Sequence, residues 1–288
     1  NTEMNEKERR YQWSDGKELI IGKKTLVMGI LNVTSDSFSD GGKWNTVDKA
    51  LAHMEEMVND GADIIDIGAE SSRPGFVPVG AKEEISTLSQ FLPHIVKKCP
   101  VPVSVDTFKA ETAEYAAKEG VHLLNDIWGL QYEKEPGEMA AVAAKYGLPV
   151  VVMHNCNNTH YSDIIKNMKE FFKKSLNIAE IVGIPKEHII LDPGIGFGKT
   201  FEQNIYVLQN LNKFMSLPYP FLLGTSRKGF LGTILDMPVT ERVEGTGATC
   251  VLGIAAGCNI VRFHDVKEIA RMCRVADVLC GNENFSVQ

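Results

Sequence analysis

The chain has 288 residues, of which 44% are hydrophobic and 23% are charged, an ordinary composition for a globular protein. Its formal net charge of −7 argues against a surface that binds nucleic acid or an anionic membrane. No stretch approaches the roughly 20 apolar residues that a membrane helix needs, and the polar first residues lack the apolar segment of a signal peptide. We therefore expect a cytoplasmic protein without nucleic-acid or membrane partners.

No two of the six cysteines have the spacing of a zinc site or a redox pair. They are expected to be reduced, mostly buried thiols. An anionic small substrate would need a local cluster of cations, because the chain as a whole is acidic.

Short apolar segments alternate with helical segments at a spacing of roughly thirty residues, which is typical of β-α-β units and a parallel sheet. The expected strands are residues 26–31, 64–67, 101–105, 122–124, 149–153, 189–191, 221–223 and 260–263. Eight repeats favour a single closed (β/α)8 TIM barrel over an open doubly wound sheet. We divide the chain into a polar extension (1–16), the barrel domain (17–281) and a tail (282–288), with a short N-terminal hairpin at residues 17–24 that turns at Gly22 and Lys23.

The segments between these strands have the period of amphipathic helices. In residues 46–60 the apolar stripe consists of Val47, Leu51, Met54 and Val58. Asn45 or Thr46 can cap the start of this helix, and Asp265 is expected to cap the last one. A third helix is predicted at residues 164–182.

In such a barrel the catalytic groups come from the C-terminal ends of the strands and from the loops that follow them. Polar or charged residues follow all eight expected strands. The set includes Asn32, Asp66, Asp106, Asn125, Asp126, His154, Asn155, Asp192, Arg227, Lys228, Arg262 and His264. A single one could be a helix cap or a turn former. So many at one mouth would cost desolvation energy unless they bound something.

The set divides into two chemical halves. Asp106, Asn125 and Asp192 suit a flat heterocycle that carries N–H and amino donors. The cationic and donor groups suit phosphate, and they are Arg73, Arg227, Lys228, Arg262 and His264. Because barrel enzymes often hold a phosphate after strands seven and eight, the sequence predicts a polar ring substrate that bears a phosphate or pyrophosphate.

Two glycine-rich patterns are misleading. Residues 194–198 look like a dinucleotide fingerprint, but the third glycine would fall at Lys199. Residues 198–200 look like the end of a Walker A loop, but its first glycine would fall at Pro193. We interpret this segment as a loop that needs close backbone approach. No spacing suits a transition metal, whereas Mg²⁺ held mostly by substrate phosphates would leave little trace in a sequence.

The same strand ends resemble the dihydropteroate synthases of folate biosynthesis. The matching segments, in family order, are residues 29–42, 66–75, 104–107, 124–127, 152–155, 191–197, 224–228 and 261–265. The resemblance implies a transferase that joins 6-hydroxymethyl-7,8-dihydropterin diphosphate to 4-aminobenzoate, giving 7,8-dihydropteroate and pyrophosphate. It also implies sulfonamide inhibitors, a Mg²⁺ cofactor and a homodimer packed through residues 245–257 and 266–278.

The resemblance assigns roles to individual residues. The pterin site would comprise Asp106, Asn125, Ile127, Met153, Asp192, Phe197, Gly224, Lys228 and Arg262. The diphosphate would meet Asn32, Ser72, Arg262 and His264, with the metal at Asn32. The aminobenzoate would meet Ser72, Arg73, Pro74, Phe197, Lys228 and Gly229. The catalytic residues would be Asp40, Arg73, Asp106, Lys228 and Arg262. The loops at 34–44 and 71–79 are expected to close over the diphosphate and to bring Asp40 to the reacting centre.

The sequence departs from the family pattern at four positions. Ser35 replaces a usual proline and should loosen the first loop, and Ala69 replaces a usual glycine. Ser72 replaces threonine and keeps the hydroxyl, whereas Gly229 stands where serine is frequent and has none. No charged group of the implied mechanism is lost.

Two other functions are open to a pterin-binding barrel. A methyltetrahydrofolate:corrinoid methyltransferase would have no use for a diphosphate site or for the Ser72, Arg73 and Pro74 loop. An inactive regulatory or subunit protein would be expected to lose Asn32, Lys228, Arg262 or His264, and all four are present. No nucleophilic triad is predicted.

Overall fold

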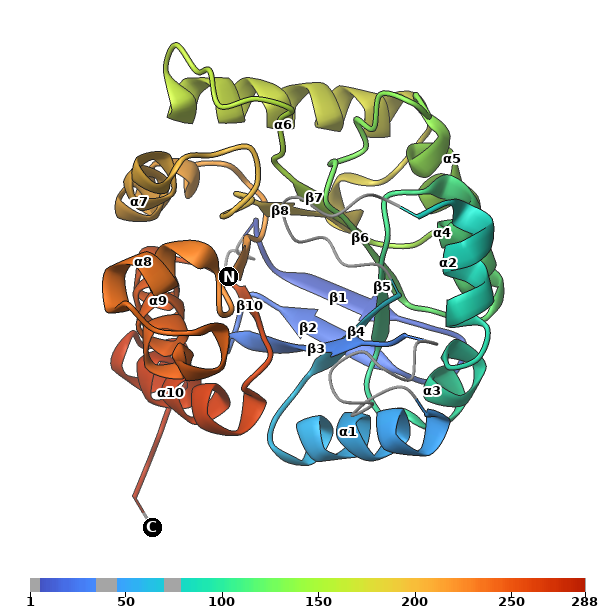
Figure 1. Ribbon diagram of the computed structural model, residues 1–288, viewed down its shortest axis with the longest axis horizontal. Coiled ribbons are helices and arrows are strands. Elements are labelled where there is room, and N and C mark those ends of the chain that lie inside the picture. Colours follow the sequence, from blue (N-terminus) through green and yellow to red (C-terminus); the bar gives the residue numbers. More distant parts are fainter. Residues whose placement is uncertain (1–5, 35–45, 70–78, 288) are drawn as a thin grey trace, which may run out of the picture.

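The computed structural model describes residues 6–34, 46–69 and 79–287 (Figure 1). Eight parallel strands form one sheet in the order β8-β7-β6-β5-β4-β3-β10-β9. A parallel bridge between Leu191 and Phe221 joins β8 to the chain just before β9 and closes the ring. The strands are β3 (Leu26–Asn32), β4 (Ile64–Gly68), β5 (Val103–Asp106), β6 (Leu123–Asp126), β7 (Val150–Met153), β8 (Ile189–Asp192), β9 (Leu222–Gly224) and β10 (Ile260–Phe263). The predicted (β/α)8 barrel is confirmed.

Helices surround the ring of strands (Figure 1). They are α1 (Val47–Asn59), α2 (Ala81–Leu88), α3 (Leu92–Lys98), α4 (Ala110–Lys118), α5 (Glu138–Tyr146), α6 (Ile164–Ile181), α7 (Phe201–Gln209), α8 (Gly229–Leu235), α9 (Val243–Ala256) and α10 (Val266–Leu279). Within the described ranges, no helix combines the length and apolar character needed to cross a membrane.

The two faces of each strand carry different residues, because successive side chains of a strand point to opposite sides. Outward residues such as Val27, Ile65 and Val105 belong to the main core under the helices. Inward residues form a second apolar cluster that includes Met28 and Ile64. Two positions beyond this inner apolar layer, on β4, β6, β8 and β10, stand Asp66, Asn125, Asp192 and Arg262. The strand period therefore places a polar layer inside the barrel, above an apolar one.

A hairpin of β1 (Arg9–Gln12) and β2 (Glu18–Ile21) closes the N-terminal end of the barrel. Its Tyr11, Leu19 and Ile21 join the inner apolar cluster. A hairpin was expected, but its predicted position at residues 17–24 was wrong. The turn lies between the two strands, where Gly16 has a φ of 86°. The first strand was missed because only alternate residues of this polar segment are buried.

The predicted cap of α1 is confirmed, whereas the predicted capping of α10 is not. Thr46 caps α1 by accepting a hydrogen bond from the Lys49 amide at 3.3 Å. Its buried face is Ala50, Leu51, Met54 and Met57, so the expected Val47 and Val58 lie at the edges of that face. Asp265 occupies the N-cap position of α10, but its side chain makes no capping bond. The six cysteines are free thiols, of which four are buried.

Candidate active site

The polar layer is held together by a fully buried carboxylate, that of Asp66 on β4. Its Oδ1 accepts from the Ser104 hydroxyl at 2.6 Å, and its Oδ2 accepts from the Asn125 amide at 3.0 Å. The Arg262 Nε donates to the same Oδ2 at 2.8 Å, and Arg262 Nη2 donates to Asp106 Oδ2 at 3.3 Å. Four strands thus contribute to one hydrogen-bonded group.

This group keeps Arg262 charged inside the barrel. Burial opposes the charge, but the carboxylates of Asp66 and Asp106 outweigh it and raise the pKa of Arg262 above its ordinary value. The guanidinium side chain is only 17% exposed. Arg262 is therefore a fixed cation directly beside Asp106, which the sequence analysis placed in the pterin half.

A second ionic group lies between β8 and the loop after β9. Burial raises the pKa of Asp192, although the Gly194 amide, at 2.8 Å, and the charge of Lys228 oppose the shift. Burial also lowers the pKa of Lys228 to about 8, with Asp192 acting in the opposite direction. The Lys228 ammonium donates to the Ile195 carbonyl and lies 4.9 Å from the centroid of the Phe197 ring. Lys228 and Phe197, expected in both the pterin and aminobenzoate sites, are thus neighbours.

The loop from Pro193 to Lys199 needs its glycines, as the sequence analysis inferred. A Cβ at Gly194 would lie 1.9 Å from the His154 carbonyl oxygen, and one at Gly198 would lie 2.6 Å from that of Cys156. Both glycines have positive φ, 69° and 58°. The backbone of this loop therefore packs directly against the segment that follows β7.

His264 and Arg227 are held by neighbours after β9 and β10. The Ser226 Oγ lies 2.6 Å from His264 Nδ1 and also accepts the His264 backbone N–H at 3.0 Å. Arg227 donates to both carboxylate oxygens of Asp265, at 3.1 and 2.8 Å. Asp265 therefore offsets the charge of Arg227, which the sequence analysis had grouped with the phosphate-binding cations.

The other described candidates lie on the same rim. Met153 pairs in register with Asp192, and Gly224 pairs with Arg262. Ile127 lies in a turn whose Trp128 and Leu130 amides donate to Asp126, at 2.9 and 2.8 Å. Asn32 is exposed at the end of β3, and Gly229 begins α8. Asp40, Ser72, Arg73 and Pro74 lie outside the described residues.

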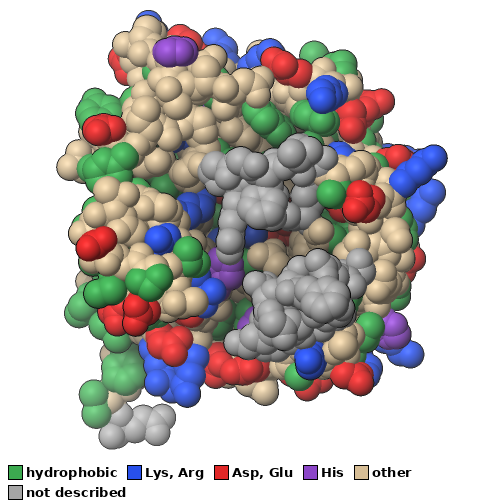
Figure 2. Space-filling view, viewed as in Figure 1, with side chains coloured by type: hydrophobic (Ala, Val, Ile, Leu, Met, Phe, Trp, Pro, Cys, Tyr) green, Lys and Arg blue, Asp and Glu red, His purple; other side chains and the backbone are tan. Residues whose placement is uncertain are grey.

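On the face of the molecule shown in Figure 2, Lys, Arg and His side chains border a central hollow. A barrel mouth of this kind is the usual place for the active site of the fold.

Comparison with known proteins agrees with this arrangement. The family model described as "pterin binding enzyme" matches residues 28–264. The chain is 50% identical over 264 residues to the dihydropteroate synthase of Clostridium beijerinckii, which covers 91% of this chain and 97% of that protein. The chain belongs to the dihydropteroate synthase family of pterin-binding enzymes.

Two solved structures of the dihydropteroate synthase family are similar throughout. The enzyme of Clostridium difficile, crystallised in the presence of pteroic acid, matches with a TM-score of 0.85 at 49% identity, covering 90% of this chain and 98% of that chain. The dihydropteroate synthase of Yersinia pestis, in complex with a sulfonamide drug, matches with a TM-score of 0.86 at 36% identity. The match covers 95% of this chain and 100% of that chain.

Sequence reasoning gave no role to two residues of this family member. Asp66 was named among the strand-end residues but was given no function. The alternation of side chains along a strand was the signal that could have placed it inside the barrel with Asn125. Lys199 was considered only within two glycine-rich patterns that were rejected. Its ammonium lies 2.8 Å from His154 Nδ1 and donates to the Gly194 and Phe197 carbonyls at 3.0 and 3.1 Å.

Val79, two residues before α2, is held by a buried ion pair that sequence reasoning also missed. Lys109 Nζ donates to Glu84 Oε2 at 3.2 Å and to the Val79 carbonyl at 2.6 Å. Glu84 Oε1 accepts from the Thr107 hydroxyl at 2.6 Å. Val79, the last residue of the predicted second loop, is thereby tied to the residues that follow β5.

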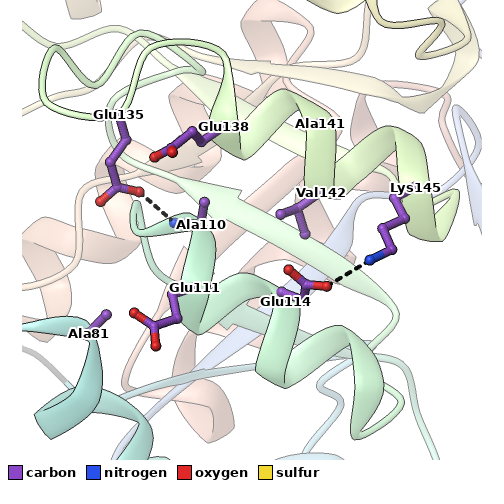
Figure 3. A pocket seen from close by; sticks show the side chains of 9 residues that line it. All are labelled: Ala81, Ala110, Glu111, Glu114, Glu135, Glu138, Ala141, Val142 and Lys145. Atoms are coloured by element: carbon purple, nitrogen blue, oxygen red, sulfur yellow. Dashed lines mark hydrogen bonds and ion pairs between the residues drawn. The ribbon is translucent and has the colours of Figure 1, made fainter.

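A hollow outside the barrel has a structural explanation. A groove of about 540 Å³ between α4 and α5 has four glutamates among its lining residues (Figure 3). The Glu135 carboxylate accepts from the Ala110 amide at the start of α4, at 2.9 Å, and Glu114 pairs with Lys145 at 2.8 Å. These carboxylates cap and cross-link the two helices, and none of the residues that line the groove is a candidate site residue.

Proposed function

We propose that this chain catalyses the reaction of its family, joining 6-hydroxymethyl-7,8-dihydropterin diphosphate to 4-aminobenzoate with release of pyrophosphate. The observation that carries the proposal is that the barrel mouth holds hydrogen-bond acceptors and cations side by side. Asp106, Asn125 and Asp192 are buried at the C-terminal ends of their strands. Arg262 contacts Asp106, and Lys228, from the loop after β9, lies near Asp192. A heterocycle with amino donors and a diphosphate needs both kinds of group within one site.

The pterin half reads the edge of the ring. Asp66 takes one donor of the Asn125 amide, which fixes the plane of that amide and leaves its oxygen to accept from the pterin. Asp106 and Asp192 accept from ring N–H and amino groups. Ile127 and Met153 line the slot, and Arg262 lies against the ring. Because these groups are buried and already hydrogen-bonded, they need little reorganisation when substrate binds.

In the reaction, the bond between the exocyclic carbon and the diphosphate oxygen breaks and pyrophosphate takes the electron pair. The carbon becomes cationic, the electron-rich pterin spreads that charge, and the carboxylates of Asp106 and Asp192 stabilise it. The amine of 4-aminobenzoate then forms the new C–N bond and loses a proton. Arg262 and His264 hold the departing diphosphate, with Ser72 as a further contact.

Mg²⁺ would be held at Asn32 and by the substrate. The side-chain oxygen of Asn32 is a hard ligand at an exposed strand end, and no group of three or more His, Cys, Asp or Glu residues in the described ranges could hold a metal on its own. That donor set fits Mg²⁺, which keeps several waters and binds phosphate oxygens. When bound, the ion would neutralise charge on the leaving pyrophosphate.

The aminobenzoate would stand beside Phe197, Lys228 and Gly229, with Arg73 and Pro74 contributing from the second loop. Arg73 and Asp40 are the catalytic residues proposed on the two loops. Sulfonamide inhibitors resemble 4-aminobenzoate in shape and should occupy the same place. Gly229 offers only its backbone at a position where serine is frequent in the family.

We further propose a cytoplasmic homodimer that packs through α9 and α10. The two helices lie against each other and expose Leu252, Val275 and Leu279, with 69%, 60% and 81% of their surface accessible. Exposed apolar side chains gathered on adjacent helices favour an interface between subunits. Light scattering should give the mass of a dimer, and Leu252→Glu should shift it toward the monomer; a monomeric parent protein would contradict the proposal.

The experiment for the proposed activity measures pyrophosphate release. Folded protein with Mg²⁺ should release pyrophosphate only when both substrates are present. Asn32→Ala should require about tenfold more Mg²⁺ for half-maximal rate, with an unchanged KM for 4-aminobenzoate. No release from folded protein that still binds the pterin would instead support an inactive pterin-binding protein.

A further inference from the structure

The ammonium of Lys199 connects two loops of the barrel mouth. Lys199 is the last residue of the loop from Pro193 to Lys199 and is followed by Thr200, the N-cap of α7. An ammonium has three N–H donors, and this one has three acceptors, namely His154 Nδ1, the Gly194 carbonyl and the Phe197 carbonyl. Its hydrogen-bonding capacity is therefore fully used within the protein.

The His154 side of this contact is rigid. Burial lowers the pKa of Lys199 to about 7, with Asp192 acting in the opposite direction. In its protonated form Lys199 can only donate, so His154 Nδ1 then accepts and the imidazole is neutral. Burial, followed by the charge of Lys199, lowers the pKa of His154 to about 2, so the ring stays neutral. The ring also packs edge-on against Phe171, with centroids 4.9 Å apart, and the His154 amide donates to the Asp192 carbonyl at 2.9 Å. Lys199 thus ties its loop to the frame of β7 and β8.

The same loop holds Lys228. The Ile195 carbonyl accepts from the Lys228 ammonium, and the Phe197 ring faces that ammonium. At Gly196 a Cβ would lie 3.1 Å from Lys228 Cδ, so the loop backbone packs along the lysine side chain. A shift of the loop would therefore move the Phe197 ring and a hydrogen-bond acceptor of Lys228 together.

We propose that Lys199 is a positioning residue for the aminobenzoate site, acting through this loop on Phe197 and Lys228. The identity of the substrate rests on the proposed function. The pterin edge is read mainly by Asp106, Asn125 and Asp192, which stand on strands β5, β6 and β8. Lys228 also belongs to the proposed pterin site, but Asp192 beside it still favours its charged form when Lys199 is replaced. Loss of the Lys199 contacts should therefore affect the aminobenzoate more than the pterin.

The test compares Lys199→Met with Lys174→Met, a matched change of an exposed lysine on α6. Lys199→Met should raise KM for 4-aminobenzoate more than about tenfold, lower kcat less than that, and change the dissociation constant of the pterin diphosphate by at most about threefold. The control should change none of these. Equal losses for both substrates, or no change in the aminobenzoate KM, would overturn the proposal.

Two further measurements keep the result independent of turnover and of one variant. Hydrogen exchange of the amides of residues 194–198 should speed up at least about tenfold in Lys199→Met, because the loop opens more often; unchanged exchange would overturn the proposed restraint. His154→Leu removes one acceptor of the Lys199 ammonium. It should also raise the KM for 4-aminobenzoate and speed up hydrogen exchange of residues 194–198. If the unaltered protein and Lys174→Met show no turnover, the proposed function fails, while the exchange data still decide whether Lys199 holds the loop.

Discussion

Arg262 is the residue whose replacement tests the polar layer most severely. Its guanidinium lies 2.8 Å from Asp66 and 3.3 Å from Asp106. Replacing it by methionine keeps much of the side-chain volume and leaves two buried carboxylates without their cation. Breaking a buried pair in this way costs about 3–5 kcal/mol. Because only 17% of the side chain is exposed, solvent should compensate little of this loss.

We expect the free energy of unfolding of Arg262→Met to fall by about 3–5 kcal/mol, measured by urea denaturation. The dissociation constant of the pterin diphosphate should rise at least roughly 30-fold, about 2 kcal/mol, measured by calorimetry on the folded variant. Arg262→Lys keeps the charge but cannot contact both carboxylates in the same geometry. Its stability and its affinity for the pterin diphosphate should lie between those of the parent protein and Arg262→Met. Arg271→Met, at an exposed position of α10, serves as the control.

Two results would refute this reasoning. An unchanged free energy of unfolding would mean that Arg262 does not compensate the charges of Asp66 and Asp106. A substrate affinity within about twofold of the parent protein, despite lower stability, would remove Arg262 from the diphosphate site.

Three further predictions concern Lys228, Asp192 and Tyr11. Burial lowers the pKa of Lys228 to about 8, so less of it is charged as the pH rises through that value. Calorimetry should show weaker binding of the pterin diphosphate above this pH, and Lys228→Arg should abolish the pH dependence; a dependence that persists in the variant contradicts the assignment. Asp192→Asn should weaken pterin binding about tenfold or more while the aminobenzoate KM changes at most about threefold, and equal effects would argue against an edge-reading role. Tyr11 is 6% exposed within the inner apolar cluster, so Tyr11→Ala should lower the free energy of unfolding by about 3 kcal/mol and leave both KM values unchanged. Denaturation with no loss of stability would show that the hairpin does not support the barrel.

The eight barrel strands were predictable from the sequence because buried parallel strands are short apolar runs. The candidate site residues were chosen as the polar residues that follow these runs, and most of the described ones lie at the barrel mouth. The last strand matches its prediction, Ile260–Phe263. Other predicted strands ended before the observed strands do. Three of them run through Asp106, Asp126 and Asp192, since a polar residue at the mouth still pairs in the sheet while its side chain is buried among polar partners. Polarity therefore marked the ends of these strands too early.

Other features depend on contacts between distant residues and leave little local pattern. The hairpin strand at Arg9–Gln12 is buried only because it caps the barrel, so its own composition looks like a polar extension. The pairing of Arg227 with Asp265 joins two loops, and either residue alone looks like a phosphate ligand or a helix cap. Lys199 contacts His154 only because the glycine loop folds back on β7. Such roles require the assembled barrel.

The barrel mouth is proposed to join a pterin to an arylamine with loss of a diphosphate. The most direct measurement is label transfer, with 4-aminobenzoate carrying ¹³C in its ring, unlabelled pterin diphosphate, Mg²⁺ and the purified protein. Mass spectrometry should find the label in 7,8-dihydropteroate, formed in equal amount to the released pyrophosphate. Pyrophosphate released without labelled dihydropteroate, or no product from folded protein that binds both substrates, would contradict the account.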